Sequence, residues 1–237
     1  MARLPRLNIP NIPQHVVQRG NNRQVCFFQK QDYTVYLNKL KEYSQQFRVS
    51  VHAYVLMTNH VHLLMTPQEA DGVSQLMQAL GRYFVRYINR GHGRTGTLWE
   101  GRFKSSLVDS QQYFLTVSRY IELNPVRAGM VSHPAKYPWS SFRGNALNKR
   151  ISLLKPHDIY KSLGKDNTER KAAYLALFEN MIEEFTLQEI REAINKRLVL
   201  GDDKFKAQIA NQCGRALSYH HHGGDRKSEI FRNSKIK

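Results

Sequence analysis

Two short runs of this sequence place side chains that can act together on a phosphate group. The first run holds His60 and His62, with the apolar Val61 between them. Residues two apart on a β-strand point to the same face, with Cα atoms roughly 6.6 Å apart. The two imidazoles can therefore converge on one cation. Imidazole binds Zn, Mn, Fe and similar ions, and a mixed site completed by amide and phosphate oxygens suits Mg²⁺ or Mn²⁺.

The second run extends from Tyr120 to Pro125. Apolar residues at helical spacing predict a helix with one buried side, and Pro125 predicts that this helix stops there. Residues four apart lie on one stripe of a helix, so Tyr120 and Asn124 share a stripe. If this stripe faces the histidine strand, Asn124 supplies a third ligand and the Tyr120 hydroxyl lies beside the same phosphate. A histidine pair that binds nothing and a tyrosine used only in packing are the structural alternatives.

The composition favours a polyanionic partner. The 237 residues carry a net charge of +17 and a pI near 10.0, and such a charge favours nucleic acid, with an anionic membrane surface as the weaker rival. The sequence has no apolar run long enough to span a membrane and no apolar core of a secretion signal near its first residue. Two cysteines are too few for a disulfide framework. We expect a cytoplasmic, nucleoid-associated protein.

The elements that must position these side chains follow from the hydrophobic periodicity. They alternate as strand, helix, strand, strand, helix, strand and helix, which predicts an α+β fold with a ferredoxin-like antiparallel sheet and helices on one side. The predicted strands are 15–19, 49–57, 60–66 and 103–109, and the predicted helices are 32–47, 73–89 and 110–123.

A different pattern follows this unit and predicts a helical C-terminal extension. Residues 169–184 have helical spacing, and a capping box at Thr186 predicts a helix that continues to Val199 and ends at Gly201. Asp203 is expected to cap a last helix that reaches Cys213. A helix-turn-helix DNA reader and a helical appendage packed on the first unit are both compatible with this pattern.

Five runs of the sequence together resemble a known family. They are Gln18–Arg23, His60–His62, Leu98–Ser105, Tyr120–Gly129 and Tyr137–Ser141. Over about residues 10–145 the chain resembles the single-tyrosine HUH transposases and, within them, the REP-associated tyrosine transposases of bacteria.

This resemblance implies an enzyme that acts on single-stranded DNA containing hairpins. Tyr120 is then the nucleophile, which forms a 5′-phosphotyrosine link and leaves a free 3′-hydroxyl. His60 and His62 are the implied metal ligands and Asn124 is the candidate third ligand, although many relatives carry Gln or another polar residue there. The implied metal is Mg²⁺ or Mn²⁺. Small relatives are dimers, whereas the long extension favours a monomer, so both oligomeric states stay open.

The interpretation divides the chain into three parts. Residues 1–150 form the catalytic domain, 151–216 the helical extension, which is a second candidate DNA-binding region, and 217–237 a basic, disordered tail. Basic, amide and aromatic side chains around the catalytic residues are candidates for DNA binding, with a solvated basic face and, for the tryptophan, core packing as alternatives. The candidates are Arg19, Asn21, Asn22, Arg23, Arg82, Arg86, Trp99, Arg102, Lys104 and Arg127.

Two functions from different classes compete on this pattern. The first is a DNA-strand transferase that cuts through Tyr120, and the second is a catalytically idle nucleic-acid-binding regulator on the same fold. The intact set of His60, His62 and Tyr120 favours the enzyme. The sequence offers no clear general base, since Glu122 points about 200° away from Tyr120 on the predicted helix.

Overall fold

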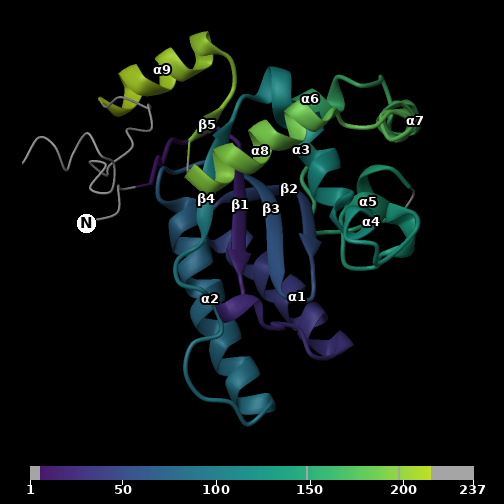
Figure 1. The fold of residues 1–237 in the computed structure, drawn as a ribbon. Helices are drawn as coiled ribbons and strands as arrows, with labels where there is room; N and C mark the ends of the chain where they lie inside the picture. The colour runs from purple at the N-terminus through teal and green to yellow at the C-terminus, as the bar shows by residue number, and fades with distance from the viewer. Residues whose placement is uncertain (1–5, 148, 197, 215–237) are drawn as a thin grey trace, which may run out of the picture.

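A five-stranded sheet forms the centre of the protein (Figure 1). The computed structural model describes residues 6–147, 149–196 and 198–214. The sheet order is β2-β3-β1-β4-β5, and the first four strands are antiparallel neighbours. The α+β, ferredoxin-like prediction is therefore confirmed. These strands are β1 (Gln14–Arg19), β2 (Val49–Leu56), β3 (His60–Pro67) and β4 (Lys104–Val108).

Strand β3 lies between β2 and β1, which gives its side chains a rigid base. His62 faces Val17 on one side and Val55 on the other. Because side chains alternate along a strand, His62 and Leu64 point to one face of the sheet while Leu63 points to the other.

Helices cover both faces of this sheet. Helices α1 (Lys30–Gln46) and α2 (Gly72–Gly91) pack on the face that holds Leu63, as predicted for the ferredoxin-like pair. Helix α3 (Ser110–Glu122) packs on the opposite face, on which the histidines lie. The prediction of helices on one side thus holds for α1 and α2 alone, because β2 and β3 are buried on both faces.

The extension contributes to the same sheet. Strand β5 (Val199–Leu200) pairs parallel to β4, and helix α8 (Glu184–Lys196) lies across the strands on the histidine face (Figure 1). The helix predicted for 169–184 is shorter, since α7 (Asn167–Ala176) ends eight residues earlier. Val199, predicted to end this helix, lies instead in β5. The predicted helix start at the Thr186 capping box is also wrong, because α8 already begins at Glu184.

The last described helix, α9 (Asp203–Cys213), begins one residue after its capping residue. Asp202 rather than Asp203 accepts the capping hydrogen bond, from the backbone N–H of Phe205. A strand separates α8 from α9, unlike the short turn of a helix-turn-helix motif. The predicted disordered tail at 217–237 lies outside the described residues.

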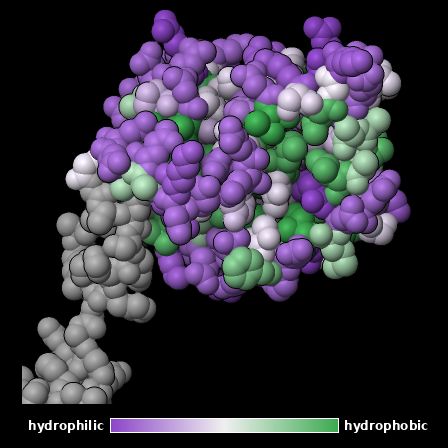
Figure 2. All heavy atoms as spheres, turned by 90° about the horizontal axis from the view of Figure 1, so that it is seen from above, coloured by the Kyte–Doolittle hydropathy of each residue, from purple (hydrophilic) through white to green (hydrophobic). Residues whose placement is uncertain are grey.

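Seen from above, hydrophilic side chains cover much of the surface, and hydrophobic ones are most numerous on the right of the view (Figure 2). None of the helices in the described ranges is long and apolar enough to cross a membrane.

Short helical turns complete the fold. They are η1 (Asn21–Arg23), α4 (Asn124–Arg127), η2 (Pro134–Lys136), α5 (Phe142–Asn145) and α6 (Asp158–Lys161).

Candidate active site

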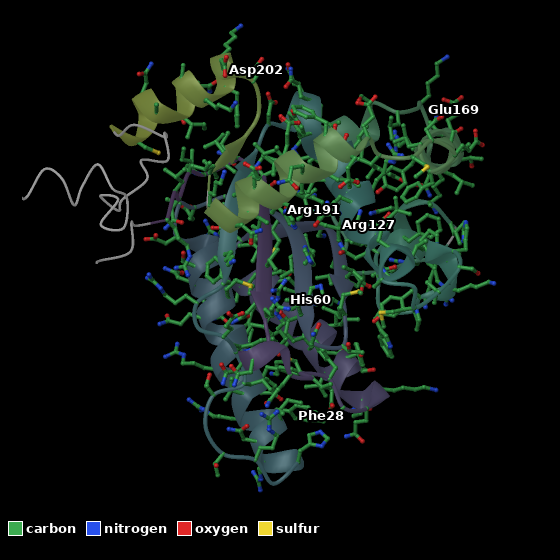
Figure 3. The ribbon with its side chains drawn as sticks, in the orientation of Figure 1. Phe28, His60, Arg127, Glu169, Arg191 and Asp202 are labelled. Carbon is green, nitrogen blue, oxygen red and sulfur yellow. The ribbon has the colours of Figure 1, made fainter. Side chains whose placement is uncertain are left out.

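A cleft of about 530 Å³ opens on the histidine face of the sheet, between the strands, α3 and α8. We call it the catalytic cleft. Figure 3 shows His60 on the strands, Arg191 on α8 and Arg127 near that helix. The polar residues that line this cleft are Arg19, His60, His62, Glu100, Arg102, Lys104, Tyr120, Asn124, Arg191 and Asn195.

The two predicted metal ligands lie side by side in this cleft. The ring centroids of His60 and His62 are 5.1 Å apart, and His62 is 6% exposed. Burial, assisted by the charge of Arg19, lowers the pKa of His60 to about 4. Burial and the neighbouring His15 lower the pKa of His62 well below its ordinary value. Both rings are therefore neutral at pH 7, the form that has a free lone pair.

Asn59 sets the orientation of the first ring. The Asn59 side-chain amide donates to the backbone oxygen of Arg23 at 2.9 Å, which fixes its Oδ1 towards His60. His60 Nδ1 lies 2.7 Å from that oxygen and must donate to it. The lone pair of His60 is therefore on Nε2. The same hydrogen bonds attach the exposed turn at Asn21–Arg23 to the strand that carries His60.

Tyr120 reaches the same cleft from the facing helix. Its ring centroid is 5.9 Å from that of His62, and the side chain is 7% exposed. The predicted helical stripe therefore faces the histidine strand. Helix α3 ends at Glu122, and Pro125 lies in the separate turn α4, as the proline predicted.

Asn124 borders the cleft with its amide group already oriented. Its Nδ2 donates to the backbone oxygens of Tyr120, at 3.0 Å, and Ile121, at 3.3 Å. Both bonds engage the nitrogen, so the side-chain oxygen is left as an acceptor or metal ligand. Arg127 contacts Tyr120 directly: its Cζ lies 4.0 Å from the ring centroid, and its Nη2 donates to the Tyr120 backbone oxygen at 2.9 Å.

The donor set fits a divalent ion with oxygen and nitrogen ligands. Within residues 6–147, 149–196 and 198–214 no three His, Cys, Asp or Glu side chains are grouped to hold a metal. The cleft instead offers two imidazole nitrogens and the amide oxygen of Asn124, three donors of the kinds that divalent ions accept.

Two cleft residues come from the helical extension, in which no individual site residue is predicted. Arg191 and Asn195 lie on α8, about seventy residues after Tyr120. Asn195 accepts a hydrogen bond from Lys104 at 3.0 Å, and Arg191 pairs with Glu184 at 2.7 Å. Nothing in the local sequence indicates that α8 crosses the cleft, because this placement depends on how β5 joins the sheet.

A second hollow of about 710 Å³ lies on the opposite face of the sheet, beside α2. We call it the α2 groove. It brings together four of the predicted DNA-binding residues: Arg82, Arg86, Trp99 and Arg102. Arg102 borders both hollows. Trp99 is 5% exposed and belongs to the α1–α2 core, so its packing alternative is present alongside its place in the groove.

Glu122 lies outside the cleft, as its helical angle predicted. It is fully buried, and its carboxyl accepts hydrogen bonds from Ser141, Asn145 and Tyr174. Burial raises the pKa of Glu122 to about 7. The side chain therefore joins α3 to the following loop and to α7, and it has no contact with the reacting groups.

Comparison with known proteins supports the resemblance seen in the sequence. Residues 8–124 match the family described as "Transposase IS200 like". A protein from Haemophilus influenzae named as a REP-associated tyrosine transposase is 27% identical over 123 residues, covering 46% of this chain and 70% of its own. A solved REP-associated tyrosine transposase bound to a REP hairpin shares the fold, with a TM-score of 0.54, 18% identity and coverage of 66% of this chain and 99% of its own. The predicted resemblance is confirmed.

Proposed function

Because residues 8–124 match the IS200-like transposase family, we propose that the protein cuts and rejoins single-stranded DNA beside hairpins through a covalent link to Tyr120. One observation carries the proposal. The Tyr120 ring and the His60 and His62 rings border the same cleft, although they come from opposite sides of it.

The chain's own residues account for the binding of a scissile phosphate. Arg19, Arg102, Lys104 and Arg191 surround the cleft with positive charge, which attracts a DNA backbone. His60 and His62 present neutral rings, and Asn124 presents an oxygen, so these three would hold Mg²⁺ or Mn²⁺. The ion, when bound, supplies Lewis-acid stabilisation of charge that develops on the phosphate.

The proposed reaction is a transesterification. The Tyr120 oxygen attacks the phosphorus and loses its proton, the bond from phosphorus to the 3′-oxygen breaks, and that oxygen takes up a proton. The products are a 5′-phosphotyrosine link and a free 3′-hydroxyl. Because the link keeps the phosphodiester energy, another 3′-hydroxyl can reverse the step and rejoin the strand. Arg127, stacked on the Tyr120 ring, orients the nucleophile.

We infer that the DNA also contacts the α2 groove. Arg82 and Arg86 supply charge on one side, and the partly aromatic wall at Trp99 suits an unpaired base. A hairpin is the proposed duplex partner, since the solved relative of the same fold was bound to a REP hairpin.

The test is cleavage of hairpin-containing single-stranded oligonucleotides by purified protein, with and without Mg²⁺ or Mn²⁺. We expect cleavage and a covalent adduct only with the ion present. Tyr120→Phe should abolish both while it leaves hairpin binding within about twofold, because one hydroxyl is removed from an intact cleft. Hairpin binding by the wild type without any cleavage would instead support the idle regulator.

A further inference from the structure

A third histidine lies directly behind the two at the cleft. His15, on β1, is fully buried, and it is absent from the cleft lining. Its ring stacks on that of His62 with centroids 5.2 Å apart and meets the Tyr120 ring edge-on at 5.8 Å. His15 therefore contacts both a proposed ligand and the proposed nucleophile.

One hydrogen bond joins the two histidines. His15 Nε2 lies 2.9 Å from His62 Nδ1. His15 is fully buried and His62 nearly so, and burial disfavours the charged form of an imidazole. In a hydrogen bond between two neutral imidazoles, one nitrogen carries the proton and donates, and the nitrogen of the other ring accepts.

The direction of this bond decides what His62 offers to the cleft. If His62 Nδ1 donates, the lone pair of His62 is on Nε2 and can bind a metal. If His15 Nε2 donates, His62 carries its proton on Nε2 and cannot bind there. In both cases His15 Nδ1 is buried and has no hydrogen-bond partner among the described residues, so this nitrogen gives little preference for either direction.

His60 shows the arrangement that a metal needs. Its Nδ1 donates to Asn59, which leaves Nε2 free. His15 occupies the corresponding place behind His62, and partners of this kind commonly fix the tautomer of a metal-binding histidine. We propose that His15 is a positioning residue, whose Nε2 accepts from His62 Nδ1 and so presents His62 Nε2 to the metal. This inference rests on the proposed function.

The first experiment measures metal binding to the protein without DNA, so that it does not depend on activity. Titration with Mn²⁺, and with Co²⁺ followed by its visible absorption, gives the affinity. His15→Phe keeps a ring in the stack but removes the acceptor, and we expect it to weaken binding by roughly 10- to 100-fold. His15→Gln places an amide oxygen near the position of Nε2 and should restore binding to within a few-fold of wild type.

The matched control is His52→Phe. His52 is another buried histidine of the sheet, 7% exposed, with partners at the Lys155 backbone oxygen and the Thr66 hydroxyl, and it is absent from the cleft lining. This variant should leave the metal affinity unchanged even if it lowers the melting temperature. Equal affinity in His15→Phe and wild type, or equal loss in His15→Phe and His15→Gln, would overturn the inference.

A second measurement needs no substitution. Long-range ¹H–¹⁵N spectra of the wild-type imidazoles should show the His62 proton on Nδ1 and the His15 proton on Nδ1. A His62 proton on Nε2 would overturn the inference even if His15→Phe failed to fold. Wild-type protein that binds neither ion, or that binds them equally after His60→Ala, would contradict the metal site of the proposed function itself.

Discussion

The two faces of one sheet are built from alternate residues of the same strands. Both faces hold an apolar cluster, and the α3 face adds buried histidines beside its cluster. On the α1–α2 face, Val61, Leu63 and Met65 of β3 are fully buried in an apolar core. On the α3 face, the intervening His62 lies beside His15 and opposite Tyr120. A shift of one residue in strand register would exchange the two sets.

The comparison indicates where stability and chemistry come from. Apolar packing by α1 and α2 on one face, and by α3 beside the cleft on the other face, holds the strands in place, so polar groups can lie close together in the cleft. Those groups are costly to bury unless they have hydrogen-bond partners. On the α3 face such partners are present for His62 and Glu122, while His15 Nδ1 has none among the described residues.

The largest expected effect comes from His62→Ala. It removes a proposed metal ligand whose loss should lower the cleavage rate by at least about 100-fold, since even partners of such ligands affect activity by 10- to 100-fold. The measurement is single-turnover cleavage of a hairpin oligonucleotide. Hairpin affinity and the cooperative melting transition should remain.

The neighbouring residue provides the reverse case. Leu63→Ala empties a fully buried position on the other face, and such changes cost about 2–5 kcal/mol of unfolding free energy. Urea unfolding should show this loss, whereas cleavage per folded molecule should change little. If both variants lost activity and stability in parallel, the separation between the faces would not hold.

A smaller effect concerns the pH dependence of stability. The pKa of Glu122 is raised from its ordinary value of 4.5 to about 7 in the folded protein. Between these values the folded form keeps a proton on Glu122 that the unfolded chain releases, so the contribution of this carboxyl to stability falls as the pH rises, by up to about 1.4 kcal/mol per pH unit. The buried histidines whose pKa values are lowered contribute with the opposite sign. Urea unfolding of wild type and Glu122→Gln from pH 4.5 to 7 therefore measures the Glu122 contribution as the difference between the two slopes.

Glu122→Gln removes the titrating carboxyl, so the stability of this variant should fall less, or rise more, with pH than that of the wild type. Leu63→Ala is the control, since it lowers stability on the apolar face without changing the slope. An unchanged slope in Glu122→Gln would show that this carboxyl is ionised in the fold.

The smallest effect tests the α2 groove. A Cβ at Gly81 would lie 3.8 Å from Gln18 Nε2 and 3.9 Å from Trp99 Nε1, so Gly81→Ala fits but narrows the groove. We expect hairpin affinity to fall about 5-fold, equivalent to ~1 kcal/mol, while helix stability rises by roughly 0.5–1 kcal/mol. Gly91→Ala, on the same helix with open space around it, is the control. Unchanged affinity in Gly81→Ala would remove the groove from the DNA path.

Local patterns predicted the parts of the molecule that depend on neighbouring residues. Alternation identified the strands and therefore the shared face of His60 and His62, and the four-residue spacing identified the stripe of Tyr120 and Asn124. The second helical layer was missed because the pattern of a strand buried on both faces does not say what covers each face.

The role of the extension depends on contacts that no short window contains. Arg191 reaches the cleft because β5, which directly follows α8 in the chain, pairs with β4 and so holds α8 over the sheet. His15 falls within the predicted strand 15–19 without a signal of its own. It lies two residues from Val17, which pairs with His62, so the strand register places it on the His62 face.

The most direct test of the central claim is to identify the residue that becomes linked to DNA. Wild-type protein is incubated with Mn²⁺ and a hairpin oligonucleotide, the covalent adduct is digested, and the modified peptide is sequenced by mass spectrometry. The shared cleft predicts a 5′-phosphate on Tyr120 and a free 3′-hydroxyl on the released strand. An adduct at any other residue, or cleavage without an adduct, would contradict it.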